Sequence, residues 1–277
     1  MPKSLSPGQV ERYRTEGYHF PVDLLSAGET AELRGRLEDY ERRTGGPIHG
    51  AMRHKTHLLF TWLNDLVRHP AILDVVEDVL GPNLLCWSSN FFIKEANDPS
   101  FVSWHQDATY WGLDKPDVVT VWVALTPANR VNGCMKFKPG SHRLQIEHRD
   151  TFDKYNLLTR GQEIAVTVDE ADAVYVELKP GQGSLHHVLL AHGSAPNRSR
   201  DRRIGYAIRY IPTHVRQIAG DRDSATLVRG TDAFGYFDPE PAPDSDLLEP
   251  ALALHAEITG RSVKVLYRGT GMDEYRS

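Results

Sequence analysis

Leu84-Leu85-Cys86-Trp87-Ser88-Ser89-Asn90-Phe91-Phe92-Ile93-Lys94 is the stretch where the pattern of this chain changes from helical to β-rich. Its aromatic and apolar residues predict a strand, and shorter β-rich runs separated by turns follow it. We predict further strands at residues 118–125, 163–168, 173–178, 184–190, 204–211 and 263–267. Many short strands behind a helical layer favour a mainly β fold, a sandwich or barrel with covering α-helices.

Helical signals precede this stretch. Ser6 and Pro7 begin a short helix that Gly17 ends, and the capping box at 26–29 begins a second helix. After Pro70, apolar residues at helical spacing predict a third helix up to residue 80. A short helix around 252–258 precedes the last predicted strand. We expect one domain over 1–277, with a helical layer at about 6–81, a β core at about 84–215 and a C-terminal extension at 216–277.

Composition excludes several classes of protein. Hydrophobic residues make up 40% and charged residues 25% of the 277 positions, as in ordinary globular proteins. The net charge of -5 argues against a general nucleic-acid binder. Two cysteines, no signal-peptide pattern and no apolar run of membrane-spanning length predict a soluble cytoplasmic protein without a membrane partner. We expect a small-molecule substrate, and the oligomeric state stays open.

A metal site is predicted around His105 and Asp107. On an extended segment these two residues leave the same face, and His192 in a His-Gly-Ser context supplies a second imidazole. Two histidines and one carboxylate suit non-haem Fe(II), although the same set also suits zinc. Trp104, Tyr110 and Trp111 flank the pair. The alternative is a surface strand that carries two polar side chains.

A second feature is the strand that begins near Arg203. Arg203, Gly205, Ala207 and Arg209 share one face, which leaves space for a ligand and a guanidinium for its carboxylate. A solvent-facing strand with two arginines is the alternative. Trp122, on another strand, lines the same cavity or fills the core. His186 and His187 are neighbours on a strand, so at most one of them approaches the metal.

These motifs together resemble a known family. His105-Gln106-Asp107, Asn132-Gly133-Cys134-Met135, Pro139-Gly140-Ser141-His142 and His192-Gly193-Ser194 with Asn197 and Arg203 are similar, in this order, to the phytanoyl-CoA dioxygenase family of Fe(II)/2-oxoglutarate oxygenases. The resemblance spans about residues 8–215. It implies a double-stranded β-helix, or jelly roll.

The resemblance also implies site roles. Iron would be held by His105, Asp107 and His192, and 2-oxoglutarate would chelate it. The distal carboxylate of 2-oxoglutarate would meet Arg203 with help from Ser194, and Trp122 and Lys55 are further candidates for cosubstrate contacts. The implied reaction consumes O2, releases succinate and CO2, and hydroxylates a C–H bond. Retention of the carboxylate at Asp107 favours hydroxylation over halogenation.

Residues 157–164 and 225–230 are similar to bacterial members that act on small metabolites, including aminoalkylphosphonate hydroxylases. We therefore expect a small polar or anionic substrate, with Arg160 or Lys55 as counter-charge. A natural-product tailoring hydroxylase, with Tyr110 and Trp111 as an apolar wall, is one alternative. A non-catalytic jelly roll that binds a ligand or metal is the alternative of another class.

Overall fold

The computed structural model describes residues 3–275, and its N-terminal part is helical as predicted. The helices are α1 (Pro7–Glu16), α2 (Ala27–Thr44), α3 (Thr61–Val67), α4 (Pro70–Leu80) and α5 (Glu249–Leu266). Ser6 and Ser26 each form a complete capping box, so the sequence signals for the starts of α1 and α2 are confirmed. Gly17 and Gly45 end these helices in the left-handed conformation, with φ of 85° and 79°.

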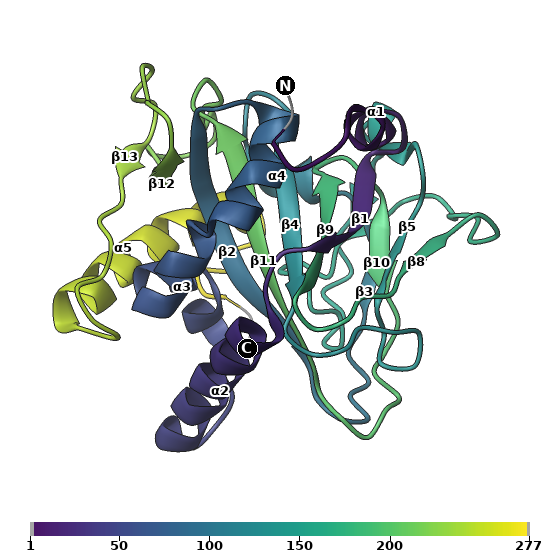
Figure 1. Ribbon diagram of the computed structural model, residues 1–277, viewed down its shortest axis with the longest axis horizontal. Coiled ribbons are helices and arrows are strands. Elements are labelled where there is room, and N and C mark those ends of the chain that lie inside the picture. Colours follow the sequence, from purple (N-terminus) through teal and green to yellow (C-terminus); the bar gives the residue numbers. More distant parts are fainter. Residues whose placement is uncertain (1–2, 276–277) are drawn as a thin grey trace.

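Two sheets form the β core, and their strands pair antiparallel except for the parallel pair β12–β13 (Figure 1). The large sheet has the order β1 (Tyr18–Asp23), β9 (Gln182–His187), β4 (Val119–Ala124), β11 (Arg203–Pro212), β2 (Leu84–Lys94), β12 (Ser224–Arg229) and β13 (Asp238–Pro239). The small sheet has the order β3 (Val102–His105), β10 (His192–Ser194), β5 (Met135–Phe137) and β8 (Val174–Val176). A third pair joins β6 (His148–Arg149) to β7 (Glu163–Ile164), and four short 3-10 helices, η1 (Gly50–Arg53), η2 (Thr56–Leu58), η3 (Asp107–Tyr110) and η4 (Ser141–Arg143), complete the elements.

The two faces of the large sheet have different partners. Ile204, Tyr206 and Ile208 of β11 pack with the helical layer in one apolar cluster. Ala207 of the same strand belongs to a second cluster with Phe137 of the small sheet. Figure 1 shows this order of layers, with α2 to α5 on one side of the large sheet and the small sheet on the other. The predicted alternation along β11 therefore determines which residues face the space between the sheets, and the fold is the expected jelly roll.

One predicted element is wrong, and two are shorter than expected. Residues 263–267 were predicted as a strand, but α5 continues to Leu266. Its buried residues His255, Ile258, Thr259 and Val263 follow helical spacing, so packing of one helix face overrides the β propensity of the local valines. The strands predicted at 163–168 and 173–178 shorten to β7 and β8, and the strand predicted at 184–190 shifts to the earlier β9. The single-domain organisation stays a prediction.

No helix within residues 3–275 has the length and apolar character needed to span a membrane.

Candidate active site

His105, Asp107 and His192 converge between the two sheets. His105 ends β3, Asp107 begins η3, and His192 begins β10, where it lies opposite His105 in the antiparallel pair. One ligand atom from each of the three side chains lies within 4.8 Å of the other two, and all three residues are buried. Asp107 therefore sits on a helical turn instead of the extended segment assumed from its spacing, but its carboxylate still meets both imidazoles.

Backbone carbonyl groups orient both imidazole rings. His105 Nδ1 lies 3.0 Å from the carbonyl oxygen of Ser103 and 3.1 Å from that of His192, and His192 Nδ1 lies 2.9 Å from the carbonyl oxygen of Leu190. When each Nδ1–H donates to these oxygens, each Nε2 keeps a free lone pair for a metal. His105 Nε2 is 3.2 Å from Asp107 Oδ1, so the donor atoms already point at one position. The chemistry of the donor set thus fits a divalent metal ion.

The charges at this cluster also suit a metal. Burial raises the pKa of Asp107, but the hydrogen bond with His105 and the electrostatic effect of the neighbouring His192 outweigh burial and hold the pKa well below its usual range. Burial, with a smaller effect of His105, lowers the pKa of His192 to about 4. At neutral pH the carboxylate is therefore charged and His192 is neutral, which are the forms that bind a metal.

A cavity of about 400 Å³ contains the three residues together with Ser194, Arg203 and Trp122. Arg203 is 1% exposed, its Nη1 donates to the carbonyl group of Gly133, and its guanidinium lies 5.4 Å from the ring centre of Trp122. Burial lowers the pKa of Arg203 to about 10, so the side chain stays cationic at neutral pH. This cavity, the smaller of two that adjoin, contains every residue that the family resemblance linked to the metal and cosubstrate except Lys55.

The predicted open space above Gly205 is occupied. A Cβ at this position would lie 1.8 Å from Cζ2 of Trp122, so the indole ring packs directly on the glycine backbone. Ala207 and Arg209, further along the same face, do line the smaller cavity. Gly205 thus makes room for a protein side chain, and the ligand space begins beyond it.

Lys94 is a residue that sequence reasoning missed. It pairs with Arg203 across β2 and β11, and its Nζ donates to Ser194 Oγ at 2.7 Å and to the Ala195 carbonyl oxygen at 2.5 Å. Burial and the nearby Arg203 lower the pKa of Lys94 to about 6. The signal was the predicted strand 84–94, which ends in a lysine, but only the strand register reveals that this lysine faces Ser194.

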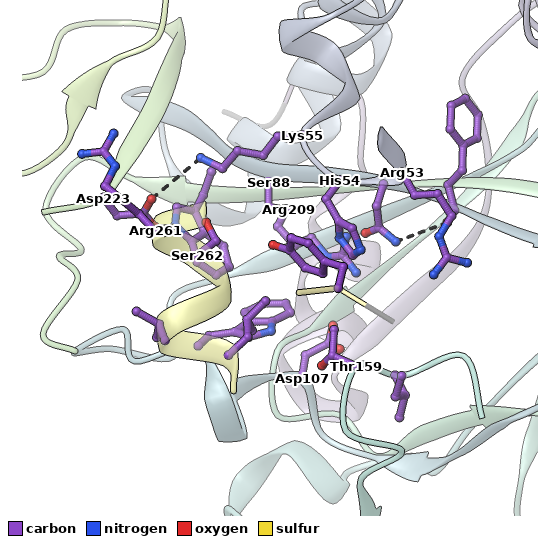
Figure 2. A pocket seen from close by; sticks show the side chains of 18 of the residues that line it. Arg53, His54, Lys55, Ser88, Asp107, Thr159, Arg209, Asp223, Arg261 and Ser262 are labelled. Carbon is purple, nitrogen blue, oxygen red and sulfur yellow. Dashed lines mark hydrogen bonds and ion pairs between the residues drawn. The ribbon is translucent and has the colours of Figure 1, made fainter. Parts of the chain in front are cut away.

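A larger cavity of about 1110 Å³ adjoins the first one and shares Asp107, Arg209 and Phe92 with it. Trp87 and Trp111 form part of its wall. Figure 2 shows Asp107 and Thr159 on one side of this cavity and His54 and Arg209 on the other, with Arg261 and Ser262 of α5 at its edge. Val265, Leu266 and Tyr275 complete the C-terminal part of the lining, and the ring of Tyr275 stacks on His54 at 4.0 Å. The C-terminal extension therefore covers the larger cavity.

Arg209 lies where the two cavities meet. It is 7% exposed, and its guanidinium forms no hydrogen bond or ion pair with another residue of 3–275. Its guanidinium lies 5.7 Å from the ring centre of Phe92 and 5.6 Å from that of Trp111. Burial lowers the pKa of Arg209, while the charge of Asp107 opposes this shift. A buried cation without a hydrogen-bonding partner is costly unless a ligand supplies one.

Two of the three predicted substrate contacts lie elsewhere. Arg160 Nε donates to the Leu266 carbonyl oxygen at 2.5 Å, and Nη2 donates to that of Arg268 at 2.8 Å, so this side chain caps the end of α5. Arg160 also pairs with Asp150 at 3.0 Å, and the Tyr110 hydroxyl donates to Asp150 at 2.6 Å. Neither Arg160 nor Tyr110 lines either of these two cavities, whereas Trp111 lines the larger one. The contacts of Arg160 and Tyr110 instead hold the end of the C-terminal helix in place.

Lys55 does not join the smaller cavity. Its Nζ donates to Glu240 Oε1 at 2.6 Å and to the Ser224 carbonyl oxygen at 2.8 Å, and Asp223 lies 4.0 Å away (Figure 2). Lys55 borders only the larger cavity, with its ammonium group directed at these acids. The structure therefore places Lys55 apart from Arg203 and Ser194. Its pairing with the buried Glu240 could not be read from the local sequence.

Of the two adjacent histidines on β9, His186 faces the metal cluster. Its ring centre is 4.7 Å from that of His192, and it lines the smaller cavity. His187 points the other way, where its ring lies 5.2 Å from that of His142. The prediction that at most one of the pair approaches the metal agrees with this arrangement.

Comparisons with known proteins agree with the geometry. The non-heme monooxygenase ThoJ, in its metal-free structure, is 41% identical with a TM-score of 0.84, and 94% of this chain and 98% of that chain are covered. CytC3 with Fe(II) and alpha-ketoglutarate is 25% identical with a TM-score of 0.63, over 88% of this chain and 98% of that chain. A probable alpha-ketoglutarate-dependent hypophosphite dioxygenase of Stutzerimonas stutzeri is 29% identical over 72% of this chain and 77% of that protein. Residues 13–205 match the model of the phytanoyl-CoA dioxygenase (PhyH) family, and the chain belongs to this family.

Proposed function

We propose that this protein is an Fe(II)/2-oxoglutarate-dependent dioxygenase that hydroxylates an unactivated C–H bond of a small anionic metabolite and releases succinate and CO2. The observation that carries the proposal is the pair of adjoining cavities. One contains the three metal-ligand candidates and a buried arginine, and the other begins at the unpaired Arg209. The named cofactors of CytC3 and the named substrate of the Stutzerimonas relative support the same reading.

His105 and His192 would hold the metal through Nε2, and Asp107 would hold it through Oδ1, which faces His105. When Fe(II) and 2-oxoglutarate are bound, they supply the oxidising chemistry that transfers one oxygen atom of O2 to the substrate. The carbonyl groups that orient Nδ1 of both histidines keep the rings in the metal-binding tautomer. The chain thus contributes a preorganised set of donors.

The smaller cavity suits the cosubstrate. Arg203 would pair with the distal carboxylate of 2-oxoglutarate, and the Ser194 hydroxyl would donate to the same group. Lys94 Nζ donates to Ser194 Oγ at 2.7 Å and so helps to hold this hydroxyl in position beside the carboxylate. Zinc hydrolysis does not require a buried arginine that binds the carboxylate of a cosubstrate. The smaller cavity therefore favours the oxygenase over zinc hydrolysis.

The larger cavity suits an anionic substrate. Because Arg209 is buried without a hydrogen-bonding partner, a carboxylate, phosphonate or similar oxyanion gains a charge-assisted contact there. Trp111 and Phe92 on either side of the guanidinium would contact the remainder of the ligand and exclude water. An anion held at Arg209 would place a neighbouring C–H bond beside Asp107, where both cavities meet.

An anaerobic titration tests the proposal. Metal-free protein is mixed with Fe(II) and then with 2-oxoglutarate, and the visible charge-transfer band of a chelated keto acid is recorded. The band should form, and succinate release should then be stimulated by one or more members of a panel of aminoalkylphosphonates and amino acids. Absence of the band in folded protein would favour the non-catalytic jelly roll. A band without stimulation by any acid would contradict the anionic substrate.

A tailoring hydroxylase for a natural product is the second candidate. The tryptophan wall of Trp87 and Trp111 favours it, since these two rings offer apolar contact surface to a ligand larger than a small acid. Aromatic carboxylic acids added to the same panel distinguish the two candidates. Stimulation by these larger acids alone would select the tailoring enzyme.

A further inference from the structure

His186 is buried in the smaller cavity without a hydrogen-bonding partner. It is 1% exposed, and neither Nδ1 nor Nε2 has a partner among residues 3–275. Its neighbour His187 is different, because His187 Nδ1 accepts a hydrogen bond from the Leu189 backbone N–H at 3.1 Å. Buried polar groups in folded proteins are generally paired, so an unpaired imidazole beside a reaction site calls for a functional partner.

The position of the ring indicates this partner. His186 Nε2 lies 3.9 Å from Asp107 Oδ2, and Thr120 Oγ1 lies 3.4 Å from the same oxygen. Asp107 Oδ1 instead faces His105 Nε2 at 3.2 Å. The two carboxylate oxygens thus have different surroundings: Oδ1 faces the metal-binding nitrogens, and Oδ2 faces β4 and β9.

We propose that His186 is a positioning residue that donates a hydrogen bond from Nε2–H to Oδ2 of Asp107 in the loaded enzyme and so directs Oδ1 toward the metal. This inference rests on the proposed function, because it needs a metal at the three-residue cluster. His186 is not a fourth member of that cluster, which within residues 3–275 contains His105, Asp107 and His192 alone. A small approach of the imidazole to Oδ2 turns the present separation into a hydrogen bond.

Packing alone does not require a histidine at this position. The His186 ring lies 5.3 Å from that of Phe137, beside apolar Ala207 and Trp122, where a phenylalanine would pack well. Partners that orient a metal-binding carboxylate typically change metal affinity by 10- to 100-fold when they are lost. Thr120, at 3.4 Å, makes a long contact that does not replace a donor on the other side of Oδ2.

The test compares His186→Phe with His186→Gln, whose amide nitrogen takes a position close to that of Nε2, and with His187→Phe as the matched control on the opposite face of β9. Fe(II) is titrated anaerobically at saturating 2-oxoglutarate. We expect roughly 10-fold weaker Fe(II) binding and a shifted charge-transfer band in His186→Phe, with recovery to within about 3-fold in His186→Gln and no change in His187→Phe. Equal Fe(II) affinity and an unshifted band in all folded variants would overturn the role of His186.

A second measurement is independent of turnover. Nitrogen-15 NMR of the histidine side chains in the zinc-loaded protein with 2-oxoglutarate reports which nitrogen of His186 is protonated. Protonation at Nε2 is expected, and a ring protonated only at Nδ1 would overturn the hydrogen bond. If the wild-type protein forms no charge-transfer band at all, the proposed function fails. If the band forms but His186→Phe is unaffected, this inference alone fails.

Discussion

The two cavities share Asp107 and Arg209 but are built from different parts of the chain. The smaller one is lined by strands β3, β4, β10 and the beginning of β11, which nearly all lie inside the family match at 13–205. The larger one takes its cover from α5 and Tyr275, well outside that match. We therefore propose that the first cavity carries the reaction common to the family and that the second cavity determines the choice of substrate.

The two buried arginines of β11 repeat this difference on a smaller scale. Arg203 donates to the Gly133 carbonyl group and lies over Trp122, so it is held in place before any ligand binds. The guanidinium of Arg209 lies near the rings of Phe92 and Trp111 and has no hydrogen bond to another residue of 3–275. One arginine is fixed for a constant ligand, whereas the other is free to meet a ligand that differs between relatives.

The largest effect should follow from His192→Ala. Loss of one nitrogen donor should weaken Fe(II) retention by at least about 100-fold and abolish the charge-transfer band, because a direct ligand matters more than the residues that orient it. Equilibrium dialysis with metal analysis measures this loss. His142→Ala, on the outer side of the sheet, should retain the metal. A His192→Ala variant that retains Fe(II) would contradict the placement of the metal site in the smaller cavity.

Arg203→Ala and Arg209→Ala should separate the two cavities. Removing a charged hydrogen-bonding partner costs about 1.5 to 3 kcal/mol, so Arg203→Ala should raise the Kd for 2-oxoglutarate by roughly 10- to 100-fold and leave Fe(II) binding nearly unchanged. Arg209→Ala should change this Kd by less than about 3-fold but remove the stimulation of succinate release by anionic compounds. The same loss of 2-oxoglutarate affinity in both variants would mean that both arginines bind the cosubstrate.

Arg160→Gln should loosen the cover of the larger cavity alone. Without the bonds to the Leu266 and Arg268 carbonyl groups, backbone amides near the end of α5 should exchange with solvent roughly 10-fold faster, since a lost cap costs about 1 to 2 kcal/mol. Hydrogen exchange read by mass spectrometry measures this rate. Arg149→Gln breaks an exposed pair with Glu163 and should leave α5 unchanged. Faster exchange in β10 as well would contradict independent cavities.

A pH-dependent effect concerns Lys94, whose folded-state pKa is about 6 against an ordinary value of 10.5. Between these two values the unfolded chain binds a proton that the folded chain releases, so this group makes stability rise with pH, by up to about 1.4 kcal/mol per pH unit. Below about pH 6 both states bind the proton, and the slope vanishes. Lys94→Met should flatten the curve of unfolding free energy against pH, measured by urea unfolding. Parallel curves for variant and wild type would show that Lys94 stays protonated.

Local sequence rules predicted several elements of the fold. The helix start at Ser6, the capping box at Ser26, the strand 84–94 and the alternation along β11 each depend on neighbouring residues, and the structure shows them as expected. The meeting of His105 and Asp107 was predictable because the two residues are close in the chain. The contribution of His192 came from its His-Gly-Ser context and from the family resemblance.

Long-range contacts account for what the sequence did not predict. Arg160 was expected to meet a substrate, but the carbonyl groups at the end of α5 lie more than a hundred residues away in the chain. Lys55 pairs with Glu240, which no local pattern links to it. The strand predicted at 263–267 failed because helical packing of His255, Ile258 and Val263 outweighs local β propensity. A charged side chain pairs with groups that lie close to it in the folded structure. The spacing of residues along the chain does not reveal which groups these are.

The antiparallel pairing of His105 with His192 has a consequence for changes in chain length. His105 and His192 are paired directly across two hydrogen-bonded strands, and this pairing determines the separation of their imidazoles. Insertions or deletions in the turns between the two strands therefore leave this separation unaltered. A deletion of one residue within β10 has the opposite result, since it turns every following side chain to the other face of the sheet. Length variation among related proteins should therefore accumulate in the connections and be absent from the three residues of β10.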